Sequence, residues 1–149
     1  MSSSKRNIDF SDLIQSRQLQ EEPRIGRDQT QRLMKRADKD LASAEAVKSF
    51  DEAAAMDLAY KAMFHASNAL LGTFNLRPGP VRQHQGVIEA VNRILGADTH
   101  ALILKFDKLR KRRNQFEYQG LFEMGSQELE EALHQAGELV EMIRKVTGK

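Results

Sequence analysis

The stretch from about residue 51 to residue 74 constrains the fold most, because its apolar residues recur at three- and four-residue steps around most of a helix. One row of this stretch holds Leu58, Ala62 and Ala69, and the adjoining row holds Ala59, Met63, Ala66 and Leu70. A helix that is apolar over much of its circumference and rich in small residues packs closely against several neighbours. The pattern therefore predicts a central helix that others surround.

Further segments with helical periodicity complete the expected fold. They cover about residues 28–50, 83–95, 99–119 and 126 onward. Short loops join them, and loops of a few residues connect antiparallel neighbours. Only three prolines and nine glycines occur in 149 residues, so few turns are encoded. We expect an all-α protein, an antiparallel helical bundle of four to five helices, with no sheet.

The first 26 residues differ from the rest because they are polar and lack sustained apolar periodicity. A short docking helix could form from Phe10, Leu13, Ile14 and Leu19, and the stretch 21–26 would break its continuation. We therefore expect a flexible or partner-docking arm over residues 1–26, and one helical domain over residues 27–149.

Composition excludes several classes of protein. The chain has no cysteine, so disulfides and thiolate metal sites are excluded. It has no apolar run near the ~20 residues needed to span a bilayer, and no secretory signal follows its basic start. A cytoplasmic protein is the default expectation. No glycine-rich phosphate loop occurs and no histidine pair has zinc spacing, so neither a cofactor nor a metal is expected.

Arg113 is the most informative position for function, because it falls on an apolar stripe where the helical period calls for leucine or isoleucine. A buried guanidinium needs partners. Glu117 lies one helical turn on, and Asn114 and Tyr118 form a second one-turn pair beside it. This cluster could bind a phosphate or a polar partner. The alternative, which spacing alone favours, is an ion pair that only fixes helix packing.

A basic run leads up to Arg113, with six cations and one aspartate between residues 105 and 113. Helical spacing places Lys108, Lys111 and Arg112 on one exposed face, which could hold a nucleic-acid backbone. An equally weighted alternative is a solvated face whose cations favour the carboxyl-terminal end of the helix dipole. No aromatic residues alternate with the cations, which weakens an interpretation as a single-strand binder.

Two of the four histidines are possible cleft residues. His65 lies in the central helix, where a hydrogen-bonded core or interface histidine is the more common role. His84 follows the Pro-Gly-Pro loop at residues 78–80, where it could cap a helix or line a groove.

Three stretches resemble the HEPN family (higher eukaryotes and prokaryotes nucleotide-binding). Residues 59–71, AYKAMFHASNALL, are similar to the segment YxAMFHAAxALL of small prokaryotic members. Residues 113–118, RNQFEY, are similar to the variant Arg-Asn-x-x-(Asp/Glu)-Tyr, and residues 84–88, HQGVI, to an HxGvi helix opening. The resemblance covers about residues 28–146.

The resemblance implies a helical bundle that dimerises, with the polar motifs of two subunits lining one cleft. Many members are metal-independent ribonucleases of toxin–antitoxin or defence systems, and small members are often paired with a minimal nucleotidyltransferase. By resemblance, the partners of this chain would be a second copy in a homodimer, RNA and a nucleotidyltransferase-like antitoxin.

The family signature is arginine, four to six residues, then histidine, and this chain departs from it. Counted from Arg113, the histidine positions hold Tyr118, Gln119 and Gly120. Tyrosine has a pKa near ~10 against ~6.5 for histidine, so it is a poor base at neutral pH. His65 or His84 could substitute only through space.

The candidate catalytic residues are therefore Arg113, Asn114, Glu117 and Tyr118, without an assigned base. The sequence favours a module that binds RNA, a nucleotide or a protein with weak or no catalysis. An active ribonuclease is the main alternative, and a purely structural bundle is the third.

Overall fold

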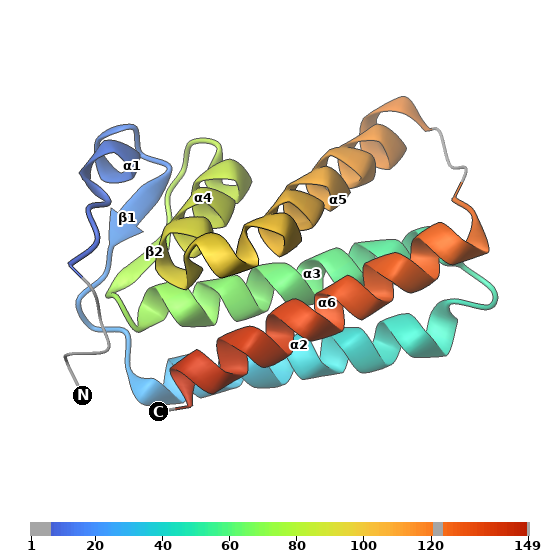
Figure 1. Ribbon diagram of the computed structural model, residues 1–149, viewed down its shortest axis with the longest axis horizontal. Helices are drawn as coiled ribbons and strands as arrows, with labels where there is room; N and C mark the ends of the chain where they lie inside the picture. The colour runs from blue at the N-terminus through green and yellow to red at the C-terminus, as the bar shows by residue number, and fades with distance from the viewer. Residues whose placement is uncertain (1–6, 121–123, 149) are drawn as a thin grey trace.

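The computed structural model describes residues 7–120 and 124–148, and over these residues it is a helical bundle (Figure 1). Its long helices are α2 (Arg27–Val47), α3 (Glu52–Gly72), α4 (Gln83–Leu95), α5 (His100–Gln119) and α6 (Ser126–Thr147). A 3₁₀ turn, Ala97–Thr99, joins α4 to α5. The predicted all-α class and the approximate helix limits are confirmed. None of the described helices is both long and apolar enough to cross a membrane.

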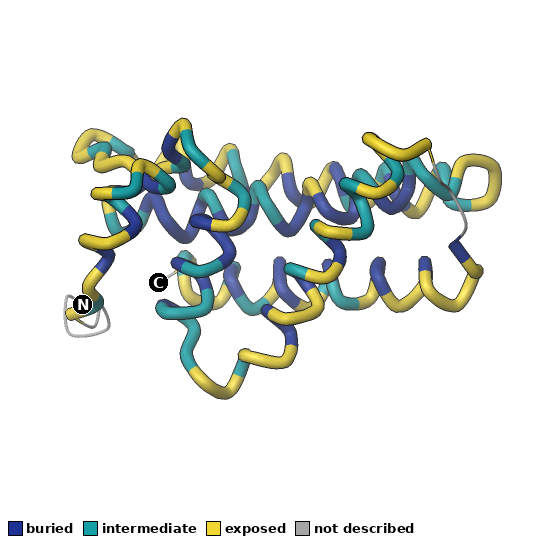
Figure 2. The backbone as a smooth tube through the Cα atoms, turned by 90° about the horizontal axis from the view of Figure 1, so that it is seen from above, coloured by how far each residue is buried: buried dark blue, intermediate teal, exposed yellow. Residues whose placement is uncertain are grey.

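Helix α3 is the centre of the bundle, as its sequence predicted. It packs against α2, α4, α5 and α6, and Tyr60, Met63, Leu70 and Leu71 on it are at most 1% exposed. Helix α6 lies along α2 and α3, while α4 and α5 cover another side of α3 (Figure 1). Buried positions recur along the inward sides of the long helices, as Figure 2 shows. The small residues of α3 allow this close approach on several sides.

A two-stranded sheet corrects the expectation of no sheet. Strand β1 (Leu19–Glu21) pairs antiparallel with β2 (Leu76–Pro78), with Leu19 opposite Pro78 and Glu21 opposite Leu76. Each strand has only three residues. Alternation over so few residues cannot be distinguished from a loop in sequence, so periodicity missed both strands.

The amino-terminal segment packs on the bundle from residue 7 onward. It forms α1 (Ser11–Gln15) and β1, and Phe10, Leu13 and Leu19 are buried. The ring of Phe10 meets Phe74 edge-on, with centroids 5.9 Å apart. The predicted arm covered residues 1–26, of which residues 1–6 lie outside the described part of the chain. The described remainder docks on its own bundle.

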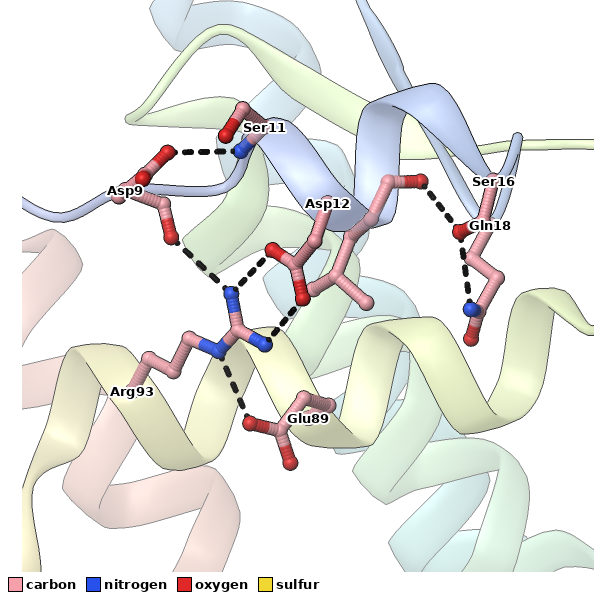
Figure 3. A network of polar contacts seen from close by, with 8 residues as sticks. Asp9, Ser11, Asp12, Ser16, Gln18, Glu89 and Arg93 are labelled. Atoms are coloured by element: carbon pink, nitrogen blue, oxygen red, sulfur yellow. Dashed lines mark hydrogen bonds and ion pairs between the residues drawn. The ribbon is translucent and has the colours of Figure 1, made fainter.

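Arg93 of α4 fastens α1 to the bundle (Figure 3). Its Nη1 and Nη2 atoms each lie 2.8 Å from a carboxylate oxygen of Asp12, and its Nε atom lies 2.8 Å from Glu89. Nη1 also donates to the carbonyl oxygen of Asp9 at 3.0 Å. The hydrogen bonds from Arg93 lower the pKa of Asp12 to about 2. A planar guanidinium that is bidentate to one carboxylate fixes orientation as well as distance.

Candidate functional site

Arg113 joins α5 to α3 at the centre of the candidate site. Its Nε atom lies 2.6 Å from Oδ1 of Asp57 on α3, and its Nη2 atom lies 3.1 Å from Oε1 of Glu117 on its own helix. Its side chain is 20% exposed. The predicted pairing with Glu117 is confirmed. The burial cost of the guanidinium is offset by a second carboxylate that sequence reasoning missed.

The charges around Arg113 reinforce each other. Nζ of Lys61, one turn beyond Asp57 on α3, lies 3.0 Å from Oδ2 of Asp57. Burial raises the pKa of Asp57, but hydrogen bonds from Arg113 and Lys61 outweigh it and hold that pKa below its usual value. Burial lowers the pKa of Arg113, yet Asp57 and Glu117 raise it overall. Asp57 and Arg113 therefore form a charged pair at neutral pH.

An aromatic cluster lies beside the guanidinium. Cζ of Arg113 is 5.5 Å from the ring centroid of Tyr60, which is 1% exposed. The hydroxyl of Tyr60 shares a 2.8 Å hydrogen bond with Nδ1 of His84, in a direction that the histidine tautomer sets. The ring of His84 stacks on Phe64, with centroids 4.3 Å apart and planes 25° apart. The structure thus connects Arg113 to His84 through Tyr60, although the two lie on different helices.

The surroundings of His84 keep its imidazole neutral. Burial lowers its pKa most, and the positive charges of Arg113 and Arg110 lower it further, against a small opposite effect of Glu117. The pKa of Tyr60 is raised, chiefly by burial, so its hydroxyl stays protonated. A neutral imidazole can accept a proton near pH 7, although a lowered pKa makes it a weaker base.

The lowered pKa of His84 predicts a specific loss of stability in acid. Below the ordinary histidine pKa of ~6.5 the unfolded chain takes up a proton that the folded site resists, so stability falls as pH drops toward the lowered value. The His84→Phe variant keeps a ring on Phe64 but cannot titrate. We expect its free energy of unfolding, measured by urea denaturation between pH 7.5 and pH 5, to fall less steeply than that of the wild type. Parallel curves would contradict a lowered His84 pKa.

The other motif residues lie apart from this cluster. Tyr118 is 81% exposed near the end of α5, and Asn114 is half-buried. Over the described residues no hydrogen bond joins these two side chains. A side chain as open as Tyr118 is available to solvent or to a second molecule, but it does not help to position Arg113.

The predicted basic face lies on the α6 side of α5. Lys108, Lys111 and Arg112 line a groove of about 650 Å³ between α5 and α6, together with Lys105 and with Glu128 and Glu131 of α6. Nε of Arg112 lies 2.9 Å from Glu128 of α6, whereas Arg113, the next residue, points to α3. Consecutive helical residues diverge by about 100°, so the groove and the Arg113 site lie on different flanks of α5.

His65 makes a separate polar pair between α2 and α3. Its Nδ1 atom lies 2.7 Å from Oδ2 of Asp40, whose side chain is fully buried. Nε of Arg36 lies 3.2 Å from the other oxygen of Asp40. His65 lies about two turns beyond Asp57 on α3, but it faces α2, whereas Asp57 faces Arg113 on α5. The carboxylate orients the imidazole as in a dyad.

Sequence reasoning missed the α3 half of the site, namely Asp57, Tyr60, Lys61 and Phe64. The available signal was a pair of charges, Asp57 and Lys61, inside an otherwise apolar helix. Only the fold shows that this pair faces Arg113, because 56 residues separate Asp57 from it.

Comparison with known proteins gives one finding. The model of the HEPN domain matches residues 30–146, which is most of the chain and includes α3, α4, α5 and nearly all of α6. No curated protein and no solved structure shows a significant match. The matched range holds every residue of the polar cluster described above.

Proposed function

The chain belongs to the HEPN family, and we propose that its Arg113 site binds RNA or a nucleotide through a phosphate group, with weak or no cleavage. Membership in this family supports a general role connected with nucleotides or RNA. The observation that carries the finer proposal is the guanidinium of Arg113, oriented by Asp57 and Glu117 at the partly exposed junction of α3 and α5.

A phosphate can enter this arrangement without rebuilding it. Asp57 is the more buried of the two carboxylates, at 29% exposure of its side chain against 45% for Glu117. Glu117 can therefore swing toward solvent while Asp57 holds the guanidinium in place. A guanidinium has more N–H donors than one carboxylate uses, and its planar fork matches phosphate oxygens. Lys61, 48% exposed, supplies a second cation.

We extend the proposal to the oligomeric state and the partners of the chain, on the basis of its membership in the family. Two copies would place their Arg113 sites in one cleft. The partners would be a second copy of the chain and a nucleotidyltransferase-like antitoxin, in a toxin–antitoxin or defence context. The groove with Lys108, Lys111 and Arg112 would add sequence-independent attraction for the backbone of a longer RNA.

Weak cleavage follows from the chemistry. RNA cleavage of this type needs a base for the ribose 2′-hydroxyl, a cation for the phosphate and an acid for the leaving oxygen. Arg113 supplies the cation. The positions where the family motif carries its histidine hold Tyr118, Gln119 and Gly120, and none of these side chains is a good proton carrier at neutral pH.

A second candidate function is metal-independent ribonuclease activity with His84 as the proton carrier. The observation in its favour is the neutral imidazole of His84, joined through Tyr60 to the cation at Arg113. This candidate differs from the first in one outcome: it requires RNA cleavage that His84→Ala abolishes while phosphate binding at Arg113 persists.

Binding of a short single-stranded RNA to Arg113→Ala tests the proposed function. One charge-assisted contact contributes about 1.5–3 kcal/mol, so we expect affinity to fall roughly ten- to a hundredfold, with a shallower salt dependence. Arg144→Ala is a matched control, because Arg144 also pairs with two carboxylates, Asp38 and Glu141, but on α6. We expect this control to bind RNA like the wild type. Equal affinity of the wild type and Arg113→Ala would refute the proposal.

A further inference from the structure

We propose that the stacked rings of Phe64 and His84 form a platform for an unpaired RNA base whose phosphate is held at Arg113 and Lys61. This inference rests on the proposed function and makes its ligand more specific, as single-stranded rather than duplex RNA. The sequence weighed against a single-strand binder because no aromatic residue alternates with the basic run of α5. The rings come instead from α3 and α4.

The platform is built in layers of decreasing burial. Tyr60 lies at its base, 1% exposed, and its ring is within 25° of parallel to both Phe64 and His84. The rings of Phe64 and His84 stack on each other with centroids 4.3 Å apart, lie 6.3 Å and 5.7 Å from the centroid of Tyr60, and are both partly exposed. The hydrogen bond between Tyr60 and His84 fixes the imidazole plane. A base that stacks here meets rings already held in place, which reduces the entropy cost of binding.

Cations border the rings on two sides. Lys61 precedes Phe64 by three residues on α3, so the two side chains are neighbours on the helix surface. Arg113 lies over Tyr60, the base of the stack. His84 is the second residue of α4, and no side chain caps the first turn of that helix. Its amide groups therefore add positive potential beside the platform. A nucleotide has this combination, an aromatic face with a negative charge near it.

Simple packing of α4 on α3 explains the rings less well. A phenylalanine that serves only the core is expected to be buried, as Phe106 is at 0% exposure against the same Tyr60. Phe64 and His84 instead remain partly exposed, although Phe64 also packs against the hydrophobic core. Stacking on aromatic rings is tolerant of base identity and requires a base that is not paired.

A pair of oligomers with equal charge tests the platform. One is a short single-stranded RNA, and the other has the same length and phosphates but abasic riboses. Stacking of a base contributes roughly a tenfold change in affinity, so we expect the wild type to prefer the RNA by about that factor. Phe64→Leu should remove the preference by weakening RNA binding alone, and Phe64→Tyr should keep it. Phe50→Leu, at a 77% exposed phenylalanine in the loop before α3, is the control and should keep it too.

The possible outcomes distinguish failure of the platform from failure of phosphate binding at Arg113. Equal binding of both oligomers by the wild type overturns the platform and leaves phosphate binding at Arg113 intact. Phe64→Leu that weakens both oligomers equally, or that changes the sedimentation of the protein, assigns Phe64 to packing or assembly and also overturns the platform. Failure of the wild type to bind either oligomer refutes the proposed function as well. An RNA that carries 2-aminopurine adds a spectroscopic readout, because its fluorescence should be quenched on the wild type and not on Phe64→Leu.

Discussion

Replacing Gly79 with alanine is expected to lower the free energy of unfolding by about 2 kcal/mol, in the range found when a well-packed contact is overfilled. A Cβ atom at this position would lie 2.2 Å from the carbonyl oxygen of Arg17. That oxygen belongs to the backbone and accepts a hydrogen bond from the amide of Val81 at 3.1 Å. The amide of Gly79 itself donates to Gln18 at 2.8 Å. The two segments must separate to admit a methyl group, and both hydrogen bonds then weaken.

The conformation of Arg17 favours loosening of the amino-terminal segment, because undocking releases backbone strain at this residue. Its φ angle is +65°, in the left-handed region that residues with a Cβ atom adopt at some cost. Docking of α1 and β1 offsets that strain through the burial of Phe10, Leu13 and Leu19. We therefore expect Gly79→Ala to loosen the amino-terminal segment before the rest of the bundle, with faster amide hydrogen exchange in α1 and β1 than in α3.

Gly137→Ala is the matched control for this prediction. Gly137 lies inside α6, and no atom lies within 4 Å of a Cβ built there. Alanine restricts the unfolded chain and favours the helix, so this variant should gain about 0.5–1 kcal/mol. Urea denaturation of both variants gives the comparison. A Gly79→Ala protein as stable as the wild type, with unchanged exchange in α1, would show that the close approach of Gly79 to Arg17 does not constrain the fold.

The same segment shows where sequence reasoning reached its limit. Periodicity located α2 to α6, because each helix exposes one face and buries another over three turns or more. The contacts of residues 7–26 are different in kind. They depend on single residues such as Leu19, on three-residue strands and on Arg93, which lies 81 residues from Asp12. No local sequence pattern encodes such pairings. From sequence alone, a polar segment that docks on the bundle therefore cannot be distinguished from one that stays free.

Within the candidate site, contacts along one helix could be predicted from sequence, whereas contacts between helices could not. Arg113 and Glu117 lie one turn apart on one helix, and their pairing could be inferred from spacing. The partnership of Arg113 with Asp57, Tyr60 and His84 depends on how α3, α4 and α5 cross. Conversely, residues that are adjacent in sequence do not all belong to the site. Arg112 is next to Arg113 but pairs with Glu128 on α6. Functional grouping here follows the faces of helices.

RNA cleavage by the purified, metal-free protein is expected to be weak, and Tyr118→His is expected to raise it by ~10²-fold or more. General acid–base catalysis typically contributes ~10²–10⁴ in rate. With Arg113 in place, histidine at position 118 recreates the spacing of arginine, four residues and histidine that the family signature has. The native Tyr118 is 81% exposed, so the substitution leaves the core unchanged. Time courses of a fluorescent single-stranded RNA measure the gain.

Three further variants assign the proton carrier in that assay. Arg113→Ala in the Tyr118→His background should remove the gain, because the charged phosphate then lacks its cation. Tyr118→Phe should leave the residual cleavage of the wild type nearly unchanged. Strong cleavage by the wild type that Tyr118→Phe abolishes would contradict weak catalysis and identify Tyr118 as the replacement for histidine. Strong cleavage that only His84→Ala abolishes would instead assign that role to His84, on the neighbouring helix, and establish the second candidate function.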